Sequence, residues 1–98
     1  MIRIVKKDNI VSITGHAMYD KYGHDIVCAS VSSILYTTVN ALLALDKESI
    51  RYVDNNKTIQ IENIKKDYYT NTLIDNMMNL FRDLSIDYPK NIKIESEE

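Results

Sequence analysis

A short segment, residues 15–32, carries the side chains of this sequence that are best suited to chemistry. It reads GHAMYDKYGHDIVCASVS and holds both glycines, both histidines and the only cysteine of the chain. A cysteine thiolate is a strong nucleophile, and a neighbouring imidazole activates it by taking the thiol proton or by pairing with the thiolate. The composition of this segment therefore makes thiol chemistry at Cys28 the first hypothesis to test.

The expected position of Cys28 suits that chemistry. Apolar spacing predicts a helix over residues 26–45, and Asp25 is a suitable N-cap because its carboxylate precedes the apolar run. Cys28 then falls in the first helical turn, where backbone amides and the helix dipole favour an anion such as a thiolate. Ser32 follows one turn later on the same face, where its hydroxyl could orient the thiol or a substrate carbonyl.

Either histidine could act as the base, and spacing alone does not choose between them. His24 precedes Cys28 by four residues, which is about one helical turn, but it lies before the expected cap. His16 lies at the end of a predicted strand, and a strand is a rigid mount for a catalytic group. Gly23 is a candidate hinge in the loop that separates them.

Each of these residues also has a structural interpretation. A lone cysteine near a helix start is more often a small core residue than a nucleophile, and both glycines suit ordinary turns. Several side chains are metal ligands in principle: His16, His24, Cys28 and Asp20 or Asp25. Their spacing matches no standard zinc site, so we expect no metal.

The rest of the chain predicts the elements that must hold this segment. Ile2 and Ile4, then Val11 and Ile13, alternate with polar residues around Asp8-Asn9, which indicates a β-hairpin. The further expected elements are a strand pair at 50–53 and 59–64, a helix at 70–88 and a strand at 92–94. The order ββαββαβ predicts an α+β domain in which two helices pack on a mostly antiparallel sheet.

Two apolar stripes are expected to face the core. The first helix offers Val27, Val31, Leu35, Thr38, Leu42 and Leu45, with Ile34 and Ala41 beside them. The second offers Leu73, Met77, Leu80 and Leu84, broadened by Ile74, Met78 and Phe81. The acidic end of the chain, ESEE, is expected to fray.

Size and composition bound the function. A chain of 98 residues predicts one domain, and a net charge of −2 argues against direct contact with nucleic acid. A single cysteine excludes an intramolecular disulfide. The amino terminus lacks the apolar stretch of a signal peptide, and no apolar run reaches the roughly 18 residues of a membrane span. We therefore expect a cytoplasmic domain with no membrane partner.

On these residues the chain resembles Prp, the bacterial ribosomal-processing cysteine protease family. The resemblance rests on GHA at residues 15–17 and on YGHDIVCASVS at residues 22–32, and it covers nearly the whole chain, 1–98. It implies that His16 is the catalytic histidine and that Cys28 is the nucleophile, whereas His24 lies outside the GHA motif.

The resemblance also implies supporting positions. Ser32 falls on a serine of the family, where the role is a supporting one, and Gly15 belongs to the GHA motif. Gly23 falls in the mobile loop that covers the active site, and Asp25 matches a position with a structural role.

The implied activity follows from the same likeness. Members of the family are alike in removing the amino-terminal extension of a ribosomal large-subunit protein, the one numbered twenty-seven, as α+β homodimers without a cofactor. Two other interpretations of the residues stay open. One is a non-enzymatic ribosome-assembly factor that grips a peptide with the loop at 15–25, and the other is a redox sensor that uses a lone reactive cysteine.

Overall fold

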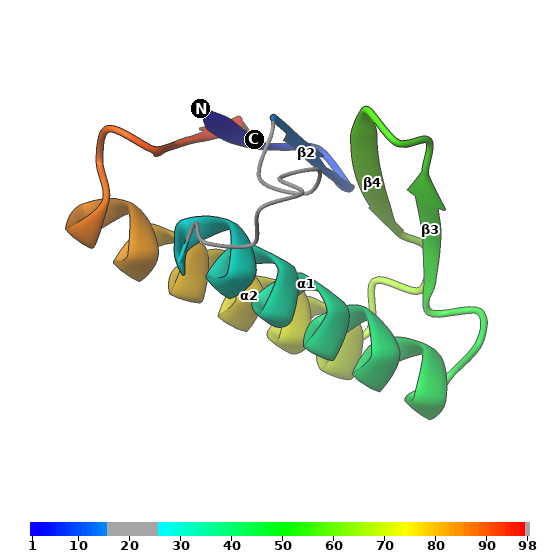
Figure 1. Cartoon of the computed structure of the whole chain (residues 1–98). Helices are drawn as coiled ribbons and strands as arrows, with labels where there is room; N and C mark the ends of the chain where they lie inside the picture. The colour runs from blue at the N-terminus through cyan, green and yellow to red at the C-terminus, as the bar shows by residue number, and fades with distance from the viewer. Residues whose placement is uncertain (16–25, 98) are drawn as a thin grey trace.

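The elements of the described chain, residues 1–15 and 26–97, follow one another in the predicted order (Figure 1). In this computed structural model they are β1 (Ile2–Lys7), β2 (Ile10–Thr14), α1 (Ile26–Leu45), β3 (Ile50–Asp54), β4 (Thr58–Asn63), α2 (Tyr68–Asp87) and β5 (Ile92–Glu97). The ββαββαβ order and the α+β class are therefore confirmed.

The strands form one sheet in the order β3-β4-β2-β1-β5. Each neighbouring pair is antiparallel except β1 and β5, which are parallel, so the sheet is mostly antiparallel as predicted. The parallel pair follows from chain order, because α2 carries the chain back across the sheet before β5 begins. Register places Ile4 opposite Ile13 and Ile13 opposite Ile59, which aligns one apolar row across three strands.

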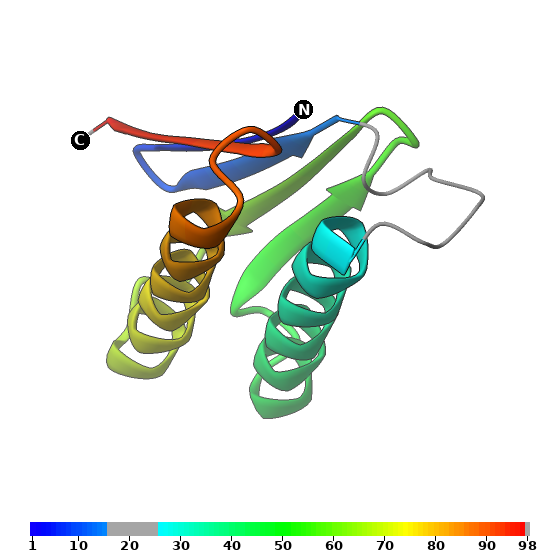
Figure 2. The ribbon, with the colours of Figure 1, turned by 60° about the vertical axis from the view of Figure 1, so that its left-hand side comes forward.

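Both helices lie side by side on the same face of the sheet (Figure 2). They run antiparallel, so the end of α1 lies beside the start of α2 (Figure 1). The buried residues of the helices are Val27, Cys28, Val31, Leu35, Thr38, Val39 and Leu42 on α1, and Thr70, Ile74, Met77, Met78 and Phe81 on α2. The opposite face of the sheet is more polar, as the alternation of each strand requires.

Two members of the expected stripes are exposed instead. Leu45 is 66% exposed because it is the last residue of α1, where no further turn covers it. Leu80 is 41% exposed, since α2 packs against both α1 and β5 and therefore buries a face centred on Met77 and Met78. The periodicity of a single helix predicts an apolar face, but it does not show on which sides the neighbouring elements pack.

The ends of α2 and β5 differ from the expected ones. α2 begins at Tyr68 because Asp67 is its N-cap and accepts the Thr70 backbone N–H at 2.9 Å. The acidic end expected to fray is a strand up to Glu97, which pairs with β1. Backbone pairing with β1 thus orders this end of the chain, and Glu95 also accepts a hydrogen bond from Arg3 at 3.1 Å on the exposed face.

The two ends of the chain meet in this sheet. Ile2 pairs with Ile92, and the Ile2 backbone N–H donates to the Asn91 carbonyl oxygen at 2.8 Å. The side chains of Ile2 and Ile92 are both buried. The first strand is thus held by the last one as well as by its hairpin partner.

Within the described residues, α1 alone is long and apolar enough to cross a membrane by length and composition. The core helix of a folded domain passes the same test, and the apolar face of α1 packs on the sheet and on α2. The helix is therefore weak support for a membrane span.

Candidate active site

Cys28 is the third residue of α1, so its predicted place in the first helical turn is confirmed. Its side chain is 8% exposed and belongs to the core cluster that contains Val27 and Val31. Cys28 thus fits both interpretations of the sequence: its side chain packs with the core residues, and it also lies at the start of a helix, where a reactive thiolate is favoured. The beginning of the helix provides the amides and the dipole that favour an anion there.

Ser32 lies one turn beyond Cys28 on the same helix and is half-buried. Residues four apart on a helix are neighbours on its surface, so the expected placement on the face of Cys28 is confirmed. The role of this hydroxyl stays a prediction.

Gly15 directly follows β2 and has a backbone conformation that side chains rarely adopt. Its φ is 123°. A Cβ at this position would press on the Met1 carbonyl oxygen and would lie 2.9 Å from the Ile2 Cα. The glycine is therefore required by the close approach of the β1 backbone, which is a more specific need than an ordinary turn.

The remaining predicted site residues lie outside the described residues. These are His16, Gly23, His24 and Asp25, together with Asp20 of the metal alternative. The structure describes what flanks them: β2 ends and α1 begins at the same end of the molecule (Figures 1 and 2). Gly15 and Ile26 therefore border residues 16–25 in the sequence, and Ile26 begins the helical turn that carries Cys28.

No three possible ligands gather in the described part of the chain to hold a metal ion. Of the ligands weighed from the sequence, only Cys28 belongs to that part. The metal alternative is therefore untested.

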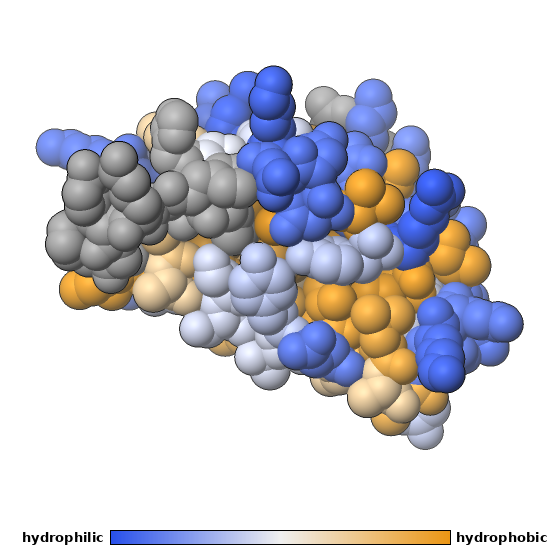
Figure 3. Space-filling view, turned by 45° about the vertical axis from the view of Figure 1, so that its right-hand side comes forward, coloured by the Kyte–Doolittle hydropathy of each residue, from blue (hydrophilic) through white to orange (hydrophobic). Residues whose placement is uncertain are grey.

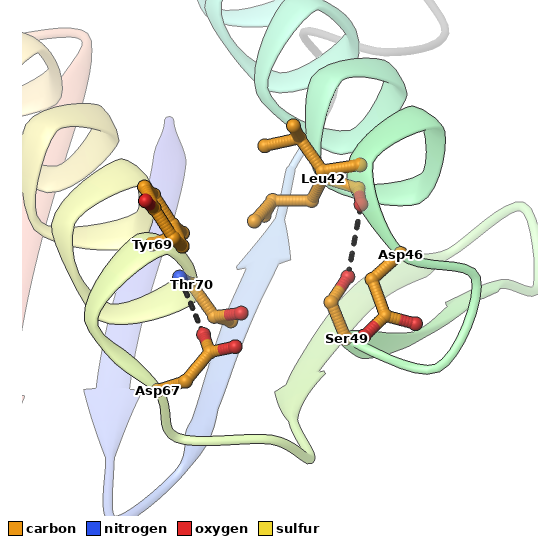
Figure 4. A pocket seen from close by; sticks show the side chains of 7 residues that line it. Leu42, Asp46, Ser49, Asp67, Tyr69 and Thr70 are labelled. Carbon is orange, nitrogen blue, oxygen red and sulfur yellow. Dashed lines mark hydrogen bonds between the residues drawn. The ribbon is translucent and has the colours of Figure 1, made fainter.

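A cavity of about 240 Å³ lies at the other end of the helix pair, between the end of α1 and the start of α2 (Figure 4). Leu42, Leu45 and Tyr69 supply its apolar wall. Eighteen residues of sequence separate Cys28 from Asp46 at this cavity, which is roughly 27 Å at ~1.5 Å per helical residue. The cavity is therefore remote from the thiol.

The polar groups of this cavity have structural partners. The Ser49 hydroxyl donates to the Leu42 carbonyl oxygen at 3.1 Å, and the Asp46 carboxylate pairs with Lys65 at 2.8 Å (Figure 4 shows the first contact). Lys65 and the Glu48 backbone N–H lower the pKa of Asp46, and hydrogen bonds from Thr70 lower that of Asp67. These carboxylates fasten the helix ends, so we assign them no chemistry.

Comparison with known protein families places the chain among thiol enzymes. Residues 1–93 match the family described as cysteine protease Prp. The chain is 34% identical over 87 residues to the ribosomal processing cysteine protease Prp of Staphylococcus aureus. This alignment covers 86% of this chain and 82% of that protein. A Prp of Bacillus subtilis is 42% identical over 33 residues, covering 34% of this chain and 30% of that protein.

Solved structures agree with the fold. The Prp of S. aureus in complex with a covalently linked product peptide superimposes with a TM-score of 0.79 at 29% identity, over 98% of this chain and 97% of the other. The same protein with a substrate peptide gives a TM-score of 0.80 at 24% identity, over the same shares of the two chains. The second comparison bears on the fold alone.

Proposed function

Because the chain belongs to the Prp family of cysteine proteases, we propose that it removes the amino-terminal extension of a ribosomal large-subunit protein, the one numbered twenty-seven. The observation that carries the proposal is the place of Cys28, the only cysteine, in the first turn of α1. The S. aureus relative in its covalent complex with a product peptide supports a covalent route.

The proposed reaction uses Cys28 and His16 as a dyad. His16 takes the proton of the Cys28 thiol, and the thiolate attacks the scissile carbonyl carbon. The tetrahedral species collapses to a thioester as the peptide nitrogen leaves with a proton from protonated His16. Water, deprotonated by His16, then attacks the thioester, which releases the extension as a carboxylate and restores the thiol.

The start of α1 supports two steps of this route. Backbone N–H groups and the helix dipole at a helix start stabilise the thiolate before attack and the oxyanion that develops after it. Ser32 is proposed to help orient the thiol or the substrate carbonyl from one turn further along. Gly15 sets the direction in which the chain leaves β2, immediately before His16.

The setting follows from the same proposal. The partner is a ribosomal protein that carries a cleavable extension, and such a substrate places the reaction in the cytoplasm. The chemistry needs no cofactor, because thiol, imidazole and water supply every group that reacts. We propose that the working form is a homodimer, with no direct nucleic-acid or membrane contact.

Incubation with the extended ribosomal protein tests this function. Product masses should show one cut that separates the extension, and Cys28→Ala should abolish it while the circular dichroism spectrum stays native. Ser33→Ala, on the exposed face of the same helix, is the matched control and should cleave normally. Cleavage by Cys28→Ala at a rate near wild type would end the proposal.

The same experiment separates the competing functions. A peptide-binding assembly factor would retain the extended protein without cutting it, and it would do so equally well with alanine at position 28. A redox sensor would instead form disulfide-linked dimers under oxidant.

A further inference from the structure

β5 forms one outer edge of the sheet, and no described element pairs with its far side. An edge strand presents backbone N–H and C=O groups that are able to pair with another strand. Beside this edge lies a groove of about 510 Å³ between the end of α2 and β5. Ile86 on the α2 side of the groove is 75% exposed, so the edge adjoins apolar surface.

The sequence of β5 is complementary to itself. Lys93 and Glu95 lie on the face of the sheet away from the helices, whereas Ile92 and Ile94 face the helices. When two copies of β5 run antiparallel about a two-fold axis at Ile94, each Lys93 lies opposite Glu95 of the other copy. Opposite charges at facing positions stabilise a strand pair, and the two-fold axis makes the contact twice.

The other edge of the sheet lacks this property. On β3 the side chains on the equivalent face are Arg51 and Val53. Antiparallel pairing about Tyr52 would place each Arg51 opposite Val53, with no countercharge. The complementarity therefore selects β5 over β3.

We propose that two copies of this chain pair antiparallel through β5, centred on Ile94, so that their two sheets become one continuous sheet. The groove beside β5 then receives the helix-facing side chains of the other copy's strand. This pairing specifies the interface of the proposed homodimer, but it does not depend on the proteolytic reaction.

The charges mainly set the register of the pairing. Glu95 already contacts Arg3 at 3.1 Å and Lys93 at 3.5 Å, and all three side chains are more than a third exposed. Ion pairs this exposed contribute little individually. Their value lies in rejecting wrong partners and wrong registers, because like charges at facing positions are repulsive.

Charge reversal tests the interface. Lys93→Glu and Glu95→Lys should each raise the dimer dissociation constant about tenfold or more, because each replaces two attractive pairs with two repulsive ones. The double variant Lys93→Glu/Glu95→Lys should dimerise as wild type does. An equimolar mixture of the two single variants should form a heterodimer, since one edge is then wholly acidic and the other wholly basic. Lys57→Glu, in the exposed turn between β3 and β4, is the control of equal charge change.

Analytical ultracentrifugation from micromolar to near-millimolar concentration measures each constant, and circular dichroism checks that each variant is folded. The proposal is overturned if wild type stays at the 11.4 kDa chain mass throughout, or if either single variant dimerises as tightly as wild type. A folded double variant that stays monomeric would overturn it as well. The measurement needs no substrate, so failure of the cleavage proposal would leave this result unchanged.

Discussion

Replacing Gly15 with alanine should destabilise the domain through the amino-terminal strand. The new methyl group would press on the Met1 carbonyl oxygen and would lie 2.9 Å from the Ile2 Cα. The Met1 carbonyl group belongs to the same planar peptide unit as the Ile2 nitrogen, so it cannot move without Ile2. Ile2 is held in place, because its side chain is 4% exposed and its backbone N–H is bonded to Asn91.

The backbone angle adds a second cost. A φ of 123° is a region that only glycine adopts readily, and holding another residue there costs of order 1–3 kcal/mol. Because the neighbouring atoms belong to a fixed backbone, we expect the upper part of that range, ~2–3 kcal/mol. For a domain of this size each kcal/mol lowers the melting temperature by roughly 4–8 °C. Gly15→Ala should therefore melt about 8–24 °C below wild type.

Thermal unfolding followed by circular dichroism measures this shift, with Thr14→Ala as the control. Thr14 precedes Gly15 on β2, is half-buried and already carries a Cβ, so its replacement should cost less than ~1 kcal/mol. Cleavage measured well below both melting temperatures should also fall in Gly15→Ala, because His16 follows directly. Equal melting temperatures for the two variants would refute the reasoning about the close approach.

Two further predictions concern charge and catalysis. Asp67→Asn keeps a capping oxygen but removes a charge whose pKa is lowered by hydrogen bonds from Thr70, so the folded state binds the proton less readily than the unfolded state. The variant should therefore melt below wild type at neutral pH. This difference in melting temperature should narrow as the pH falls below 3.8, the ordinary pKa of an aspartate carboxyl. A difference that does not change with pH would contradict this cause. His16→Ala should slow cleavage roughly 10²-fold or more, the usual effect of losing a general base, and His24→Ala should slow it less. The reverse ranking in a steady-state assay would make His24 the base.

Hydrophobic periodicity was sufficient to predict the elements. The alternation of Ile2 and Ile4, and of Val11 and Ile13, is visible within a few residues because side chains alternate along a strand. The helix at 26–45 was predictable because its apolar residues recur three or four positions apart. Its predicted start placed Cys28 in the first turn. Local patterns therefore fixed the nucleophile candidate.

Features that depend on distant residues could not be predicted in this way. The polar end of the chain indicated fraying, but it becomes ordered because its backbone pairs with β1, some 90 residues earlier in the sequence, as in the pair of Ile2 with Ile92. The requirement for glycine at position 15 comes from Met1 and Ile2, which reach it only when the hairpin closes. Leu80 is exposed because two neighbours determine which face of α2 is buried. In each case the residues that interact are far apart in the sequence, so a pattern over a few neighbouring residues cannot reveal the interaction.

The parallel pairing of β1 with β5 bears on synthesis of the protein itself. β5 leaves the ribosome after the other six elements, so β1 lacks one of its two neighbours until β5 has been made. Contacts between residues as distant in sequence as Ile2 and Ile92 also form slowly, because a long loop must close first. Ile2 is the residue that Gly15 approaches, immediately before the proposed catalytic histidine. A nascent or truncated chain that lacks β5 would therefore hold its amino-terminal hairpin poorly, so proteolytic competence would appear only after β5 has joined the sheet.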